Sequence, residues 1–281
     1  MEKFSNTVLI TDLDGTLLPD SKILNEKDLN AIRYFRENGG IFTIATGRVI
    51  QAAEQFFEPL KPDAPVILNN GGLIYDTAKK EIIREHCADR AAKEYTVALM
   101  EKFPEMGVEV NLPDGIYAVR MSRWERLHLE LTHLPYKEKR LEDIPDSGWC
   151  KVLYSMGEGR VKELAEYAAE MGWDKTSFVI SGDFLFECLP KDCTKGSALK
   201  ELSSLEGWEN YTVAAAGDYD NDLEMLEFAD IAIAPRNARD IVKKSADIVT
   251  NADCCGGAIA EAIEYLKTKK QKGSDKIWTQ Q

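Results

Sequence analysis

The chain has 281 residues, of which 44% are hydrophobic and 9% aromatic, enough to build one large domain or two smaller ones with buried cores. Its 35 lysines and arginines against 48 aspartates and glutamates give a net charge of −13, which opposes binding to nucleic acid or anionic lipid. No stretch approaches the roughly 20 apolar residues that cross a bilayer, and the first residues lack a signal-peptide core. We therefore expect a cytoplasmic protein with neither nucleic-acid nor membrane partners.

The cysteines give no sign of a metal or disulfide framework. All 6 are scattered along the chain without paired spacing, and only 3 histidines accompany them. Cys254 and Cys255 are adjacent, but a bridge between neighbours is strained, so reduced thiols are expected.

Both ends of the chain alternate apolar runs of strand length with segments of helical period, which is typical of a parallel sheet covered by helices on both faces. At the start, a strand over 7–11 is followed by a helix that Asn25 caps and by a strand over 41–45. The tail repeats this order with strands at 212–216, 231–234 and 248–250 and helices at 222–228, 238–245 and 257–267. The pattern predicts an α/β fold with a doubly wound, Rossmann-like parallel-sheet core.

The middle of the chain differs from both ends. Short strands and hairpin-like runs replace the alternation, and Pro113, Asp114 and Gly115 form a turn signal between two of them. We therefore predict an inserted α+β domain over 79–183, within a core made of 1–78 and 184–281.

Two carboxylates follow the first predicted strand directly. Asp12 and Asp14 precede Gly15, at the strand edge where open α/β sheets bind their ligands. Two such close carboxylates repel unless a cation or a shared proton relieves them. A run of this kind is equally typical of a turn that caps a helix, so taken alone it leaves both interpretations open.

The second predicted strand delivers Thr46, Gly47 and Arg48 to the same edge. A hydroxyl and a free amide at the start of a helix suit a phosphate group, although the same pattern is common in ordinary N-caps.

A later strand is followed by Asp218, Asp220 and Asp222, which imitate the start of a calcium loop. That alternative fails because Leu223 stands where such a loop needs glycine and Ala229 where it needs a bidentate glutamate.

One basic residue is placed to face these acids. Lys195 begins the amphipathic helix that follows the insert, so its ammonium can reach the acidic strand ends. A lysine on a helix is usually solvated, but here three strand ends and one helix start each contribute a different part of a phosphoryl-transfer site.

Four segments together resemble, in order and spacing, the motifs of the haloacid-dehalogenase-like hydrolases. Asn69 to Gly72 and the long insert between the second and third motifs are most similar to the Cof-type phosphatases, which carry the larger αβ cap. The resemblance covers the whole chain. The four segments are Asp12-Leu13-Asp14-Gly15-Thr16-Leu17, Ala45-Thr46-Gly47-Arg48, Lys195, and Gly217-Asp218-Tyr219-Asp220-Asn221-Asp222.

The resemblance implies two catalytic carboxyls and a metal site. Asp12 would attack phosphorus and form an aspartyl phosphate. Asp14 would pass a proton to the leaving group and then take one from water, a task for which we expect a pKa raised by neighbouring acids. Mg²⁺ would be the cofactor, bound by Asp12, by the Asp14 carbonyl and by Asp218.

The remaining residues would bind the phosphoryl oxygens or support those that do. Thr46, Gly47, Lys195 and Asn221 would hold the oxygens, and Leu13 would add its backbone amide. Asp222 would either anchor Lys195 or support the metal from behind. The resemblance gives no role to Arg48 or Asp220.

The expected function is a Mg²⁺-dependent phosphatase acting on a small phosphorylated metabolite, with a sugar phosphate as the default substrate. Two alternatives stay open: a phosphotransferase or mutase with the same intermediate, and a phosphate-sensing regulatory protein without turnover. The mutase branch resembles enzymes with a small helical cap near the first motif, for which 17–25 leaves no room. The sequence makes no prediction of the oligomeric state.

Overall fold

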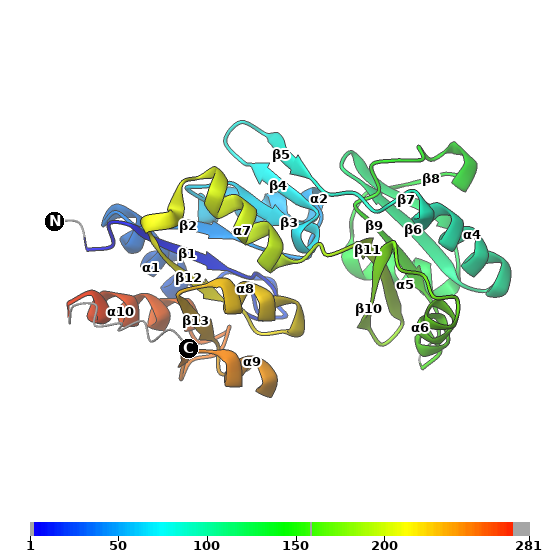
Figure 1. Cartoon of the computed structure of the whole chain (residues 1–281). Helices are drawn as coiled ribbons and strands as arrows, with labels where there is room; N and C mark the ends of the chain where they lie inside the picture. The colour runs from blue at the N-terminus through cyan, green and yellow to red at the C-terminus, as the bar shows by residue number, and fades with distance from the viewer. Residues whose placement is uncertain (1–2, 158, 272–281) are drawn as a thin grey trace, which may run out of the picture.

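The computed structural model of the protein describes residues 3–157 and 159–271. Figure 1 shows two parts, each built around its own sheet and joined by two chain connections. One part contains both ends of the described chain, and the other is formed by the middle of the sequence.

A sheet of five parallel strands forms the centre of the first part, in the order β14-β13-β12-β1-β2. β1 lies in the middle, paired with β12 on one side and β2 on the other. The predicted parallel sheet is therefore confirmed, although β2 ends one residue earlier than expected. The strands are β1 (Thr7–Thr11), β2 (Ile41–Ile44), β12 (Thr212–Ala216), β13 (Ile231–Ala234) and β14 (Ile248–Val249).

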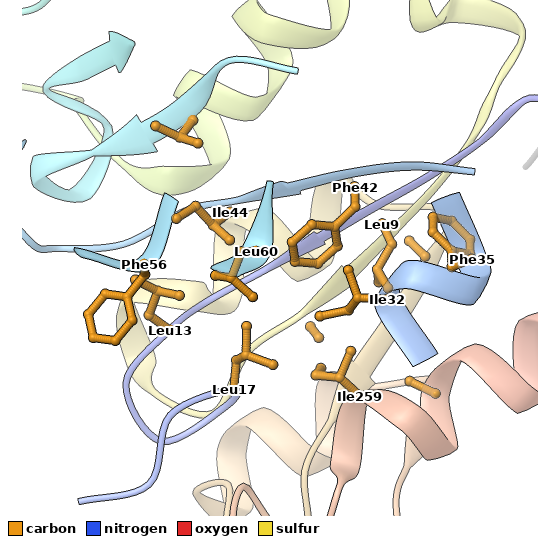
Figure 2. Packing of buried hydrophobic residues seen from close by; sticks show 14 of the residues in the cluster. Leu9, Leu13, Leu17, Ile32, Phe35, Phe42, Ile44, Phe56, Leu60 and Ile259 are labelled. Carbon is orange, nitrogen blue, oxygen red and sulfur yellow. The ribbon is translucent and has the colours of Figure 1, made fainter. Parts of the chain in front are cut away.

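Both faces of this sheet are covered by helices, because alternate residues of β1 enter two different cores. Leu9 packs in a cluster with side chains of α1 (Glu26–Glu37) and α10 (Ala258–Gln271), which Figure 2 shows around Ile32 and Ile259. Its neighbours on β1 pack on the opposite face, against α7 (Lys195–Leu205) and α8 (Leu223–Phe228). The doubly wound prediction is confirmed.

Capping residues fix where two important helices begin. The Asn25 side chain accepts a hydrogen bond from the Lys27 amide at 2.8 Å, as predicted, and so starts α1. Thr194 and Ser197 form a reciprocal capping box at the start of α7. This box places Lys195 in the first turn of that helix.

A small antiparallel sheet, β3-β4-β5, lies beside the central one, and a single parallel bridge links Ala45 to Ile67 of β3. Its strands are β3 (Val66–Leu68), β4 (Leu73–Asp76) and β5 (Glu81–Glu85). The other short elements are α2 (Ile50–Ala53), α3 (Phe57–Leu60), α9 (Asp240–Ser245) and five 3₁₀ turns: Glu54–Phe56, Asn69–Gly71, Leu141–Asp143, Trp208–Asn210 and Asp220–Asp222.

The second part is a six-stranded mixed sheet in the order β10-β11-β9-β6-β7-β8, which we call the cap. One face packs in an apolar core with α4 (Ala91–Lys102) and α6 (Val161–Glu170), whereas α5 (Arg123–Thr132) lies against β6 and β9. The strands are β6 (Gly107–Leu112), β7 (Gly115–Arg120), β8 (Tyr136–Glu138), β9 (Lys151–Ser155), β10 (Thr176–Gly182) and β11 (Leu185–Pro190).

Strand pairing differs from the division predicted at 79 and 183. β5 pairs with β4 on the core side, and β11 pairs with β9 inside the cap sheet. Strand partners are set by contacts distant in sequence, which a change in sequence texture does not encode. We therefore propose that the insert runs from the residue after Glu85 to Cys193.

All 6 cysteines are free thiols, as expected. Over 3–157 and 159–271, none of the helices combines the length and the apolar character that crossing a bilayer requires.

Candidate active site

The end of β1 positions the first predicted carboxylates. Asp12 continues the strand, since its amide donates to the Ala216 carbonyl at 2.9 Å, and its side chain is buried. The chain then turns at Gly15, whose φ is +83° and where a Cβ atom would lie 2.3 Å from Asp218 Oδ2. Glycine is needed twice at this position, for the left-handed backbone and for the close approach of Asp218.

Lys195 connects the first and fourth motifs. Its ammonium, 1% exposed, donates to Asp12 Oδ1 and to Asp222 Oδ1, both at 2.6 Å. The second oxygen of Asp222 accepts the amides of Asp218 and Tyr219 at 2.9 and 3.0 Å. Both Asp222 oxygens are thus engaged by hydrogen-bond donors, one by Lys195 and the other by two backbone amides.

One oxygen of each of Asp12, Asp218 and Asp222 lies within 4.8 Å of the others, an arrangement that fits a cation. Burial raises the pKa of Asp12, against the attraction of Lys195, and raises the pKa of Asp218 to about 6. Lys195 engages one oxygen of Asp12, and the Thr16 hydroxyl donates to Asp218 Oδ1 at 2.7 Å. The second oxygen of each carboxylate suits a hard divalent ion, which would relieve their mutual repulsion.

Asp14 contradicts one expectation. Arg48 binds it through two nitrogens, at 2.6 and 2.7 Å, and Lys22 donates to it at 2.5 Å. Burial works to raise the pKa of Asp14, but the hydrogen bonds from these two cations outweigh burial and hold the pKa at about 2. The predicted rise was wrong because cations, rather than other acids, are the nearest neighbours of this carboxyl.

The second motif forms the other wall of the site. Thr46 is buried after β2, and its hydroxyl accepts from the Arg48 amide at 3.2 Å. Gly47 lies against the Asn70 side chain, where a Cβ would be 2.9 Å from Oδ1. That same Oδ1 accepts a hydrogen bond from Asn221 Nδ2 at 2.9 Å. Asn70 therefore bridges Asn221 of the fourth motif and Gly47 of the second. The side chain of Leu13 points into the core, which leaves only its backbone for the site (Figure 2).

A single cavity of about 930 Å³ joins these core residues to the cap. On the core side it is lined by predicted site residues, and on the cap side by polar residues of β6, β9 and α5. Lys195 and Asp222 lie behind this lining, bonded to Asp12 as described above. The predicted lining residues are Asp12, Asp14, Thr46, Gly47, Asp218 and Asn221.

Three residues that hold the predicted carboxylates Asp14 and Asp218 were not predicted as part of the site. Arg48 and Lys22 hold Asp14, and Thr16 holds Asp218. Arg48 and Thr16 stand inside motifs already recognised, so their position was a usable signal. Lys22 lies on an irregular loop, and nothing in its sequence context indicates its contact.

Comparisons with known proteins agree with the phosphoryl-transfer site that this geometry indicates. The family profile of haloacid dehalogenase-like hydrolases matches residues 9–263. A 5-amino-6-(5-phospho-D-ribitylamino)uracil phosphatase of Bacillus subtilis is 29% identical, covering 91% of this chain and 96% of its own. A pyridoxal phosphate phosphatase of Escherichia coli is 27% identical, covering 86% and 92%.

Solved structures share the fold. A haloacid dehalogenase-like hydrolase from Bacteroides thetaiotaomicron superposes with a TM-score of 0.83 at 23% identity, covering 93% of this chain and 100% of its own. The predicted fold and enzyme class, a phosphoric monoester hydrolase, are confirmed. Because the profile matches almost the whole length of this chain, the chain belongs to the haloacid dehalogenase-like hydrolase family.

Proposed function

We propose that the protein is a Mg²⁺-dependent phosphatase that hydrolyses a small phosphorylated metabolite, with a sugar phosphate as the expected class. The observation that carries this proposal is the buried Lys195 ammonium bound between Asp12 and Asp222, behind a cavity shared with the cap that Asp12, Asp14 and Asp218 line. Relatives named as phosphatases of phosphorylated small molecules support the substrate size.

In the proposed reaction, an Asp12 oxygen attacks phosphorus while the bond to the substrate oxygen breaks. The product is an aspartyl phosphate, and the leaving alkoxide takes a proton from Asp14. Asp14 then removes a proton from water, whose oxygen attacks the same phosphorus, and Asp12 and inorganic phosphate are released. Each step exchanges one bond to phosphorus and one proton.

Asp14 must change partners during this cycle. With Arg48 and Lys22 on its oxygens it is ionised, which suits removal of a proton from water. Before it can donate a proton to the alkoxide, at least one of these cations must leave it. The incoming phosphate dianion is a competing partner for both, since cations pair strongly with phosphate.

Several donors would stabilise the transferring group. The charge on its equatorial oxygens would be met by Lys195, the Thr46 hydroxyl and the Gly47 amide. Asn221 donates a hydrogen bond to Asn70, whose side chain lies against Gly47. Mg²⁺, held by Asp12, the Asp14 carbonyl and Asp218, would neutralise the phosphate and lower repulsion from the attacking carboxylate.

Phosphate release from p-nitrophenyl phosphate tests this function. The purified protein should cleave the ester with Mg²⁺ present, lose activity after EDTA treatment and recover it when Mg²⁺ is restored. Inorganic phosphate should appear in equal amount to p-nitrophenol, because water is the acceptor. Undiminished turnover in EDTA, or nitrophenol without phosphate, would contradict the proposal.

A further inference from the structure

The face of the cap sheet that lines the cavity is polar. Side chains alternate along β6, so Val108 and Val110 enter the cap core while Glu109 and Asn111 face the other way. Lys151 of β9 stands directly opposite Asn111 in the strand register. All three polar residues line the same cavity as Asp12 and Asp14.

Asn111 carries a buried acceptor without a partner in the described part of the chain. Its Nδ2 donates to Glu109 Oε1 at 2.8 Å, which fixes the amide so that Oδ1 points away from Glu109. Asn111 is only 1% exposed, and its Oδ1 receives no hydrogen bond there. Buried acceptors of native proteins are normally paired, so this oxygen indicates a ligand that donates to it.

Glu109 and Asn111 each carry a buried oxygen without a hydrogen-bond partner, but they differ in the groups that surround it. Glu109 Oε2 also lacks a donor, but it lies 3.8 Å from His128 Nε2, and Glu125 is close behind it. Burial, and then the charge of Glu109, raise the pKa of Glu125 to about 8, while Ser155 donates to its other oxygen at 2.7 Å. A protonated Glu125 can therefore serve Glu109, and no comparable donor serves Asn111.

The charges on this face disfavour an anionic group. Lys151 lies 3.2 Å from Glu187, so its charge is already compensated. Burial lowers the pKa of His128, which keeps the imidazole neutral at neutral pH. Glu109 therefore leaves this part of the cavity with a net negative charge, and a second phosphate or a carboxylate would meet repulsion there.

Aliphatic side chains also line the cap side of the cavity. Ile116 of β7, Leu131 of α5 and Leu134 after it line the cavity beside the polar residues. A ligand in this space would meet both hydrogen-bonding groups and aliphatic carbon.

We propose that Asn111, supported by Glu109 and facing Lys151, binds the leaving group of the substrate, and that this group is uncharged and carries hydroxyl donors. This inference rests on the proposed phosphatase function. Asn111 Oδ1 accepts from one hydroxyl, and the Lys151 ammonium donates to another. Specificity then follows from the cost of leaving the buried oxygen of Asn111 unpaired with any substrate that lacks a donor.

Three six-carbon esters test the substrate class: sorbitol 6-phosphate, n-hexyl phosphate and 6-phosphogluconate, with p-nitrophenyl phosphate as reference. We expect kcat/KM for sorbitol 6-phosphate to exceed each of the other two by about tenfold or more. If the protein cleaves p-nitrophenyl phosphate but shows no preference for sorbitol 6-phosphate, the assignment of the leaving group is overturned while the proposed phosphatase function stands. No phosphate release from any of the four overturns the proposed function instead.

Variants of Asn111 and Lys151 test whether these residues recognise the leaving group. Asn111→Leu keeps the branched shape of the side chain but removes the acceptor, together with the donor to Glu109. The value of kcat/KM for sorbitol 6-phosphate should therefore fall about tenfold or more, while the value for p-nitrophenyl phosphate changes less than about threefold. Lys151→Met should likewise lower kcat/KM for sorbitol 6-phosphate much more than for p-nitrophenyl phosphate. It replaces the first variant in the test if Asn111→Leu does not fold. Glu163→Gln, at an exposed position of α6, is the control and should change kcat/KM for neither substrate. Equal losses on both substrates in a folded variant would assign Asn111 a structural role and overturn the proposal.

Discussion

The Lys195 ammonium and the Asp222 carboxylate form a buried ion pair, 2.6 Å apart, that joins the helix after the cap to the loop after β12. The loop depends on the same carboxylate, because the other Asp222 oxygen accepts two of its backbone amides. Asp222 is therefore both the partner of Lys195 and the centre of the turn that presents Asp218.

This pairing predicts strong coupling between the two residues. Lys195→Met would leave two carboxylates buried without a cation, and Asp222→Asn would bring an amide NH₂ against other donors. Each change should lower the free energy of unfolding by about 3–5 kcal/mol. The double variant should lose less than the sum, by about 1–3 kcal/mol, in urea unfolding. Lys200→Met, exposed on the same helix, is the control, and additive losses would contradict the pairing.

Asp12 and Asp14 should fail differently when changed to asparagine. Asp12→Asn removes the attacking oxygen, so no covalent phosphoenzyme should form. Asp14→Asn removes only the proton carrier, so it should still react with p-nitrophenyl phosphate, whose leaving group needs little protonation, and then accumulate phosphoenzyme. Mass spectrometry of quenched protein distinguishes the two. Asp220→Asn, in the same acidic loop as Asp218, should behave like the unchanged enzyme, and phosphoenzyme in Asp12→Asn would assign the nucleophile elsewhere.

Gly15→Ala should disrupt the proposed metal site as well as the backbone. A Cβ there would lie 2.3 Å from Asp218 Oδ2, and the φ of +83° is unfavourable for alanine by about 1–2 kcal/mol. We expect a lower free energy of unfolding and a large increase in the Mg²⁺ concentration needed for activity. Gly172→Ala is a matched control, since φ is +63° but nothing lies within 4 Å of its Cβ. It should lose similar backbone stability yet keep full activity, whereas equal activity in both variants would exclude the proposed contact.

Asp28 predicts a pH dependence of stability. It lies under α10, where Oδ1 accepts from the Ala260 amide at 2.7 Å, and burial raises its pKa from 3.8 to about 6. Between these values the folded protein binds more protons than the unfolded chain, so stability falls as pH rises through 6. The shift corresponds to about 3 kcal/mol at most.

Asp28→Asn keeps the acceptor but cannot ionise. It should therefore be about 1–3 kcal/mol more stable than the parent at pH 8 and nearly equal to it at pH 4, as measured by urea unfolding at both values. Asp20→Asn on the surface should show neither effect. A constant difference between parent and Asp28→Asn at both pH values would contradict the assignment.

The sequence alone was sufficient for the sheet and for the composition of the motifs. Alternating hydrophobicity in strands such as β1 and local capping by Asn25 depend on neighbours a few residues away, so they can be read directly from the chain. The same holds for Asp12, Asp14 and Lys195, because strand ends and helix starts of a parallel sheet meet at one edge.

Only the tertiary structure decided what those residues touch. Arg48 and Lys22 reverse the expected pKa shift of Asp14, and their positions depend on side-chain directions and a loop path that no local pattern encodes. The end of the insert likewise depends on β11 pairing with β9, and the orphan acceptor on Asn111 emerges only once β6 and β9 are in register. Local periodicity selects secondary structure, but ionisation and ligand contacts depend on distances between residues far apart in the chain, which folding alone sets.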